Sequence, residues 1–238
     1  MKKITYLFGG LLFCSTLFAQ RPIEANPFSL EGGLSLNSNS NMFSAPMLKF
    51  RYFANDDVAA RLGVMHSFSR DIYKVYGADG DGFPTEDSTG TQTVRNAETW
   101  ISLGASYHFS QMERLSPYIS LDVLIGFGSS KEEWEDYDSP SGPVVLGGDA
   151  GDGDYERGSN ATVELAGNGF GIGLGAGFDY YFAENVFLGA ELGFNLTSMQ
   201  DRGGEVTVGS ISADILPMGS NLNIANSANA TLRLGWRF

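Results

Sequence analysis

The sequence predicts an all-β protein, an eight-stranded antiparallel up-and-down β-barrel that crosses a membrane with its strands. Three observations support this fold class. Eight segments alternate apolar with small or polar residues, short turns alternate with long connections, and aromatic residues gather at one end of the segments. A period of two is typical of strands whose two faces have different surroundings. About ten residues per segment is the length that a tilted strand needs to cross a bilayer.

The composition excludes several other classes of protein. The 238 residues include 31 Gly and 17 Phe, and only 18% are charged, which argues against disorder, coiled coils and helical bundles. The net charge is −13, whereas nucleic-acid binding needs clustered cations that displace counterions from phosphates. The single cysteine, Cys14, excludes a disulfide framework and cysteine-based zinc sites. We therefore expect no nucleic-acid partner and no cofactor.

The first residues have the pattern of an export signal. Lys2 and Lys3 give a positive start, an apolar run follows from Ile4 to Phe18, and Ala19 supplies a small residue for cleavage. The run is shorter than the roughly 20 residues that a membrane-spanning helix needs, so a secretory signal peptide is the better interpretation. We expect residues 1–19 to be the signal peptide and residues 20–238 to form the barrel domain.

The eight alternating segments follow one another along the rest of the chain. The clearest is the sixth, in which apolar residues take every second position from Phe170 to Phe182, with glycines between them as far as Gly177. Because the pattern lacks the strand-to-helix context of a phosphate-binding loop, we interpret these glycines as space for side chains from across the barrel. In order, the segments are Phe28–Leu36, Leu48–Tyr52, Val58–Val64, Ile101–Phe109, Ile119–Phe127, Phe170–Phe182, Val186–Leu196 and Ala228–Phe238.

The connections distinguish a membrane barrel from a soluble sandwich, which also alternates. Three of them are short, at residues 54–57, 110–116 and 183–185, and they alternate with long ones at 37–45, 70–97, 129–160 and 199–224. Short turns on the periplasmic side and long loops outside are typical of outer-membrane barrels. Val206–Val208 and Ile211 leave two alternatives open, a further hairpin above the membrane or ten strands in place of eight.

Aromatic residues indicate the membrane boundary near the short turns, because rings with one polar end favour the interface between lipid and water and form a belt there. We place at this level Phe28, Tyr52, Phe53, Tyr107, Phe109, Tyr118, Tyr180, Tyr181, Phe182, Phe187, Trp236 and Phe238.

Charged residues occupy the opposite parity of the strands, which points into the barrel. Unpaired charges are costly in lipid, and eight strands enclose a space that side chains can fill. Five acids and five bases face inward: Glu31, Lys49, Arg51, Arg61, Glu98, Asp122, Asp179, Glu191, Arg233 and Arg237. Since neither sign is in surplus, we expect a polar plug rather than an ion path. The charge network that we expect comprises Glu31, Lys49, Arg51, Arg61, Asp122, Glu191 and Arg233.

The last strand, Thr231–Phe238, alternates and ends in Phe. In this it resembles the small eight-stranded outer-membrane barrels of Gram-negative bacteria, of the OmpA, OmpX and OmpW kind. The resemblance covers almost all of the chain after residue 19 and implies an outer-membrane location, with membrane lipid around the strands. It also implies that Trp236 and Phe238 belong to a signal that the barrel-assembly machinery reads during insertion.

The long connections contain two candidate cation sites. The third carries many acids, among them Glu132, Glu133 and Glu135, and is a candidate for divalent cations or a basic partner, although a solvated loop explains it more simply. The second contains four weak metal candidates that fit the calcium-loop pattern only in part: Asp79, Asp81, Glu86 and Asp87.

These features favour a structural or interaction role, with acidic extracellular loops over a plugged polar lumen. The main alternative is a narrow OmpW-like channel for small or apolar solutes. The third, with less support, is a lipid A-modifying enzyme, because His108-Phe109-Ser110 has the spacing of a lipid A deacylase. That motif lies at the periplasmic end, whereas such enzymes act on the outer leaflet, so we expect no enzymatic activity.

Overall fold

The computed structural model describes residues 26–36, 44–78, 84–109, 112, 114–135, 160–217 and 219–238. The predicted signal peptide lies outside these residues. The described chain forms nine strands, which are β1 (Phe28–Leu36), β2 (Ser44–Phe53), β3 (Val58–Ala78), β4 (Pro84–His108), β5 (Leu115–Glu135), β6 (Ala161–Tyr181), β7 (Val186–Val208), β8 (Ile211–Ile215) and β9 (Ser220–Arg237).

Eight of the described strands close into an antiparallel ring, which confirms the predicted fold class. Each strand from β1 to β7 pairs with the next, β7 pairs with β9, and β9 pairs with β1. Closure at the last strand aligns Ser29 with Arg237 and Leu34 with Leu232. Such a ring satisfies the backbone hydrogen bonds that lipid cannot satisfy.

Strand β8 lies outside the ring. It forms a hairpin with the end of β7, from Val208 opposite Ile211 to Gly204 opposite Ile215. Of the two alternatives that the sequence left open, the structure therefore shows the additional hairpin and not ten strands.

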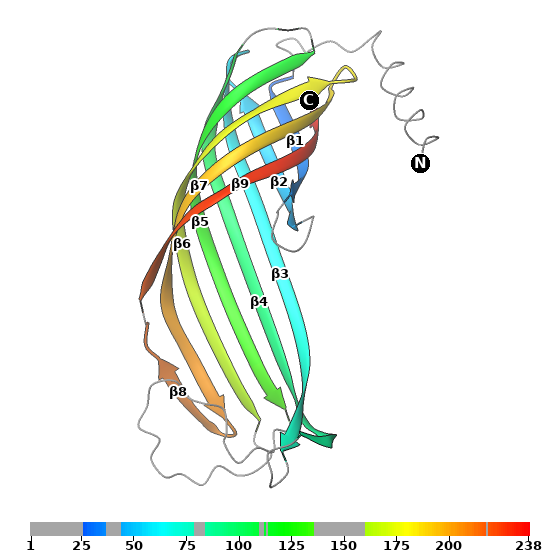
Figure 1. The fold of residues 1–238 in the computed structure, drawn as a ribbon. Helices are drawn as coiled ribbons and strands as arrows, with labels where there is room; N and C mark the ends of the chain where they lie inside the picture. The colour runs from blue at the N-terminus through cyan, green and yellow to red at the C-terminus, as the bar shows by residue number, and fades with distance from the viewer. Residues whose placement is uncertain are drawn as a thin grey trace, which may run out of the picture.

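The strands differ greatly in length. β1 and β2 have 9 and 10 residues, whereas β3 to β7 have between 21 and 25. In Figure 1 the long strands continue far beyond β1 and β2, away from the end at which β9 finishes. Crossing a bilayer takes about 9–11 residues, so these strands build a tall wall outside it.

The prediction of a loop at 70–97 was wrong for most of its length, because β3 and β4 pair as far as Ala78 and Pro84. The tall wall likewise shortens the predicted loops at 129–160 and 199–224. Outside lipid, water contacts the sheet and removes the need for strict alternation of apolar and polar residues. The sequence pattern therefore reported only the part of each strand that crosses the membrane.

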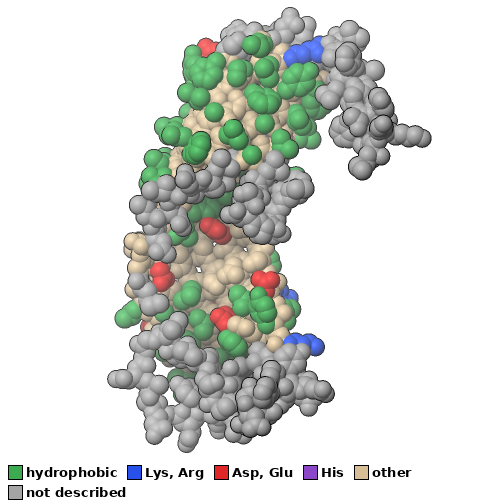
Figure 2. All heavy atoms as spheres, viewed as in Figure 1, with side chains coloured by type: hydrophobic (Ala, Val, Ile, Leu, Met, Phe, Trp, Pro, Cys, Tyr) green, Lys and Arg blue, Asp and Glu red, His purple; other side chains and the backbone are tan. Residues whose placement is uncertain are grey.

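An apolar band surrounds the half of the barrel near the short turns. Figure 2 shows hydrophobic side chains gathered over this half of the visible face, while the other half is more mixed. Leu48, Leu121 and Phe170 are each more than half exposed, an arrangement that is unfavourable in water and favourable in hydrocarbon. No helix in the described part of the chain is long and apolar enough to cross a membrane.

The aromatic belt is only partly as predicted. Phe28, Tyr52, Tyr107, Phe109, Trp236 and Phe238 are exposed on the outer surface. Four other members, Phe53, Tyr118, Tyr181 and Phe187, are at most 5% exposed. These four share the inward parity of their strands, so they fill the lumen instead of contacting lipid.

The arrangement predicts which end of the barrel faces outward. A cysteine introduced by Ile72→Cys, on the tall part of β3, should react with a membrane-impermeant maleimide on intact cells, because Ile72 is 58% exposed. A cysteine introduced by Glu184→Cys, in the turn between β6 and β7, should react only after permeabilisation. The opposite pattern would show that the barrel is inverted. Removal of the predicted signal peptide, which contains Cys14, leaves no other cysteine.

Candidate functional site

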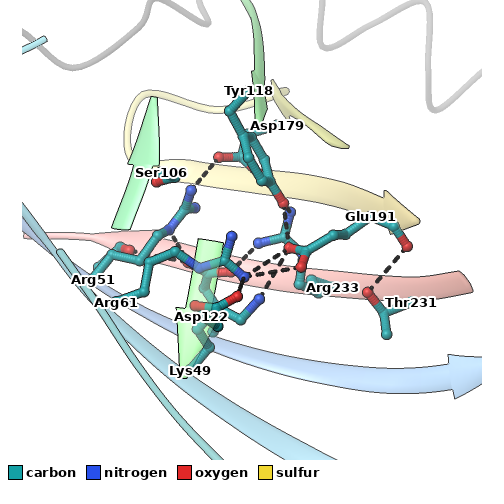
Figure 3. A network of polar contacts seen from close by, with 12 residues as sticks. Lys49, Arg51, Arg61, Ser106, Tyr118, Asp122, Asp179, Glu191, Thr231 and Arg233 are labelled. Atoms are coloured by element: carbon teal, nitrogen blue, oxygen red, sulfur yellow. Dashed lines mark hydrogen bonds and ion pairs between the residues drawn. The ribbon is translucent and has the colours of Figure 1, made fainter. Parts of the chain in front are cut away.

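Four charged side chains near the short turns form a closed ionic group, here called the inner cluster: Glu31, Arg51, Asp179 and Arg233. Both guanidinium groups pair with both carboxylates, and Arg51 Nη1 lies 2.7 Å from Asp179 Oδ2 while Arg233 Nη2 lies 3.0 Å from Asp179 Oδ1. The four side chains are 0–1% exposed. They come from β1, β2, β6 and β9, so the cluster ties together strands on different sides of the ring (Figure 3).

A second cluster, Lys49, Arg61, Asp122 and Glu191, lies next to the first toward the long strands. Glu191 accepts from Lys49 Nζ at 3.0 Å and from Arg61 Nη2 at 2.9 Å, and Arg61 Nη2 is 3.4 Å from Asp122 Oδ2. Two cations thus face two carboxylates. Burial of charges is tolerated where they are paired in this way.

Tyr118 joins the two clusters. Its hydroxyl donates to Glu191 Oε2 at 2.6 Å and accepts a hydrogen bond from Arg233 Nη2. The guanidinium groups of Arg51 and Arg61 also lie within 6 Å of the centre of its ring, at 5.8 and 5.7 Å. The two clusters and Tyr118 are here called the lumen network, which brings together side chains from every strand of the ring except β4.

Aromatic rings close the end of the lumen near the short turns. The guanidinium of Arg237 stacks 4.0 Å from the centre of the Phe53 ring, and Arg51 lies 5.1 Å from that of Phe187. Tyr181 packs on Phe187, with the ring centres 5.2 Å apart. A cation over an aromatic face keeps part of its electrostatic stabilisation without water. This layer explains why four aromatic residues of the predicted belt point inward.

His108 belongs to the same buried layer. Its Nδ1 is 2.8 Å from Ser116 Oγ and its Nε2 is 3.2 Å from Ser106 Oγ, and its ring lies 5.0 Å from that of Tyr118. The residue is 2% exposed. Ser110, the partner in the His-x-Ser spacing, lies outside the described residues. The geometry gives His108 a packing role between two other serines.

Inward-facing glycines provide the space for these side chains. A Cβ on Gly177 would lie 2.7 Å from the Tyr118 hydroxyl, and one on Gly189 would lie 2.7 Å from Arg233 Nη2. A Cβ on Gly126 would lie 2.8 Å from the Trp100 ring. The glycine-rich β6 and its neighbours thus make room for large groups that cross the lumen, as their sequence pattern predicts.

The structure places all seven residues of the predicted charge network in the lumen. It adds Asp179 and Arg237, which were among the inward-facing charges, and Tyr118, whose role the sequence analysis missed. Tyr118 shares its parity with Ser120 and Asp122, a signal that could have identified it. Glu98 does not join the network: it is exposed and accepts from Trp100 Nε1 at 2.6 Å. Of the ten predicted inward charges, five cations and four carboxylates thus lie in or beside the lumen network, whereas Glu98 pairs with Trp100.

Above the lumen network, on the side of the long strands, lies a cavity of about 230 Å³. The second cluster forms its polar floor. Its apolar walls are inward-facing side chains of β2, β3, β4 and β5, which are Met47, Met65, Trp100 and Leu124. Trp100, whose inward parity is unusual for a ring near the outer rim, lies against Gly126 and Gly169.

The remaining predicted sites lie mostly beyond the described residues or at the surface. Of the weak calcium candidates, Asp79 and Asp81 lie outside the described residues, and the side chains of Glu86 and Asp87 do too. Trp236 and Phe238 are on the lipid-facing side, and their role in assembly stays a prediction.

On the tall wall, Lys131 bridges Glu133 and Glu164 at 3.1 and 2.7 Å. The hydrogen bond from Lys131 lowers the pKa of Glu133 below its ordinary value, and the bonds to Glu164 and Glu133 raise the pKa of Lys131. Glu133, a described acid of the third connection, is thus partly neutralised by Lys131 on its own strand and by Arg95 on β4.

Comparison with known proteins gives one family match. The model of the OmpA-OmpF-like porin family matches residues 34–196. Among solved structures, a major outer membrane protein from Thermus thermophilus is 18% identical with a TM-score of 0.45, covering 90% of this chain and 100% of that chain. The N-terminal β-barrel domain of Pseudomonas aeruginosa OprF is 18% identical with a TM-score of 0.32, covering 89% and 96%. Ail of Yersinia pestis is 14% identical with a TM-score of 0.31, covering 89% and 95%. No curated protein matches the chain.

Some glycines are closely packed and others are not, so the loss of stability caused by an added methyl group should depend on the position. Gly235→Ala should lower the free energy of unfolding by about 1–3 kcal/mol, because its Cβ would overlap the fully buried Phe187 ring. Gly32→Ala is the matched control, since its Cβ meets nothing within 4 Å. Equilibrium urea unfolding in lipid vesicles measures both changes. Equal effects would contradict the packing described here.

The inner cluster predicts a large effect for the loss of one carboxylate. Glu31→Gln leaves Arg51 and Arg233 to share Asp179, and removal of one partner from a buried ion pair costs about 3–5 kcal/mol of stability. Glu164→Gln, on the exposed wall beside Lys131, should change the unfolding free energy little. The same urea unfolding experiment measures both. A Glu31→Gln barrel as stable as the parent would show that the cluster does not stabilise the fold.

Proposed function

Because the chain belongs to the OmpA-OmpF-like porin family and is an outer-membrane β-barrel protein, we propose that it acts as a closed barrel with a structural and interaction role. The observation that carries this proposal is the lumen network. Eight strands enclose an interior that side chains fill, and here the filling groups are buried ion pairs and rings held from most sides of the ring. A conducting path would require several of these pairs to separate.

The tall wall supports the interaction part of the proposal. Beyond the apolar band, β3 exposes Phe68, Ile72 and Tyr73 by 52–62%. A sheet that extends this far into water presents a large rigid surface to other envelope components or to a target outside the cell. The acidic third connection adds a further candidate surface for divalent cations or a basic partner, and its described acids begin at Glu132.

The alternative of a narrow channel for small or apolar solutes has one observation in its favour, the cavity on the outer side of the network. The third alternative, lipid A modification, has little support. His108 is buried beside Ser106 and Ser116 at the end of the barrel opposite the tall wall. The absence of enzymatic activity is accordingly part of our proposal.

Conductance across a planar bilayer tests the closed barrel. The parent protein should give no discrete current steps, whereas the double variant Arg51→Ala/Arg233→Ala should leak, because it removes both cations of the inner cluster. Arg70→Ala, on the exposed part of β3, is the control that should stay silent. A gel that separates folded from boiled protein verifies that each variant is folded. Reproducible steps from the parent protein would favour the channel and overturn the proposal.

A further inference from the structure

The cavity above the lumen network combines features of a small-molecule site. Binding pockets in proteins are typically apolar with a few placed polar groups. Here the charged groups form the floor, the neutral polar side chains of Ser102, Asn195 and Thr231 also line the cavity, and the apolar walls are two methionines, a leucine and the face of an indole. At about 230 Å³ the cavity is smaller than the roughly 300 Å³ at which pockets for drug-sized ligands begin. An occupant must therefore be small.

The floor determines the charge of an occupant. Lys49 and Arg61 pair with Glu191, and Arg61 also pairs with Asp122, so the four groups neutralise one another. Lys49 and Arg61 are 4 and 3% exposed in their side chains, and Asp122 and Glu191 are 12 and 11% exposed. A ligand with a net charge would have to displace one of these partners or remain uncompensated in a buried place, and both are costly. A head that is neutral and both donates and accepts hydrogen bonds meets cations and carboxylates without breaking a pair.

The walls determine the other end of the occupant. Trp100 is held flat against the backbone where Gly126 and Gly169 leave space, so its ring faces the lumen as a fixed apolar surface. Met47 and Met65 lie opposite each other on β2 and β3. Thioether side chains adapt to the shape of an apolar group. The walls therefore suit a short branched or aromatic body and do not specify a single shape.

We propose that this cavity binds a small amphipathic molecule, neutral overall, whose polar head contacts the Lys49, Arg61, Asp122 and Glu191 floor and whose apolar body contacts Met47, Met65 and Trp100. The site lies on the side of the long strands, so an occupant that enters from that side does not pass the inner cluster. Binding at this site is therefore independent of the proposal that the barrel is closed.

Fluorescence of Trp100 tests this site. The chain has three Trp, so the variant Trp134→Phe/Trp236→Phe keeps Trp100 as its single fluorophore. In lipid nanodiscs, isovaleramide should shift the emission with a saturable dependence on concentration. Isovalerate and isoamylamine, which share the branched body but carry one charge, should bind at least about tenfold more weakly, a factor that corresponds to about 1.4 kcal/mol.

Two substitutions locate the effect in the cavity. Ser102→Phe places a ring in the space, since Ser102 lines it, and should abolish the saturable shift. Ser102→Leu, which adds a smaller apolar side chain and no second Trp, is the second filling variant, used if the first does not fold. Leu103→Phe, on the lipid-facing side of the same strand, should leave binding unchanged. The proposal is overturned if isovaleramide gives no saturable shift, if a charged analogue binds as tightly, or if a folded filling variant binds like the parent.

Discussion

The ion pairs among Glu31, Arg51, Asp179 and Arg233 are the interaction on which the rest of the structure depends. A strand that crosses hydrocarbon must turn its polar side chains toward the interior, and eight strands leave little room for water there. Glu31, Arg51, Asp179 and Arg233 consequently pair with one another, and Tyr118 accepts a further hydrogen bond from Arg233. Their mutual pairing fixes which strands face each other and which residues must be glycine, as Gly189 beside Arg233 illustrates.

The same constraint accounts for the division of the molecule along its axis. Near the short turns, lipid outside and ion pairs inside impose strict alternation of side chains. Farther out, β3 to β7 continue into water, and their contacts become ordinary surface pairs such as Lys131 with Glu133 and Glu164. Between these two regions the lumen network gives way to a cavity with apolar walls. A base filled with ion pairs, a small cavity above it and an extended outer sheet thus follow one another along the strands as their surroundings change from lipid to water.

The sequence predicted those features of the structure that a lipid environment imposes, and it missed features that lipid does not determine. Alternation predicted the eight strands, their antiparallel order and the inward side of Arg51 and Arg233, because a shift by one residue would expose charges to hydrocarbon. It underestimated β3 and β4, whose outer halves have water around them and carry no strict pattern. It placed Phe53 and Phe187 at the correct level, but a level along the axis does not specify whether a ring faces lipid or lumen. Parity also does not report the partner of a side chain: Glu98 has the inward parity, but its carboxylate accepts from Trp100 Nε1.

A double-mutant cycle tests whether the charges of the inner cluster stabilise the barrel through one another. Arg51→Met and Asp179→Leu each leave an unbalanced buried charge, whereas the two together leave Glu31 paired with Arg233. Urea unfolding of the parent, both single variants and the double variant in lipid vesicles gives the coupling free energy. If the charges do so, the double variant should be more stable than the sum of the single changes implies, by about 1–3 kcal/mol. Additive losses would contradict this prediction, because they would show that these charges do not stabilise the barrel through one another.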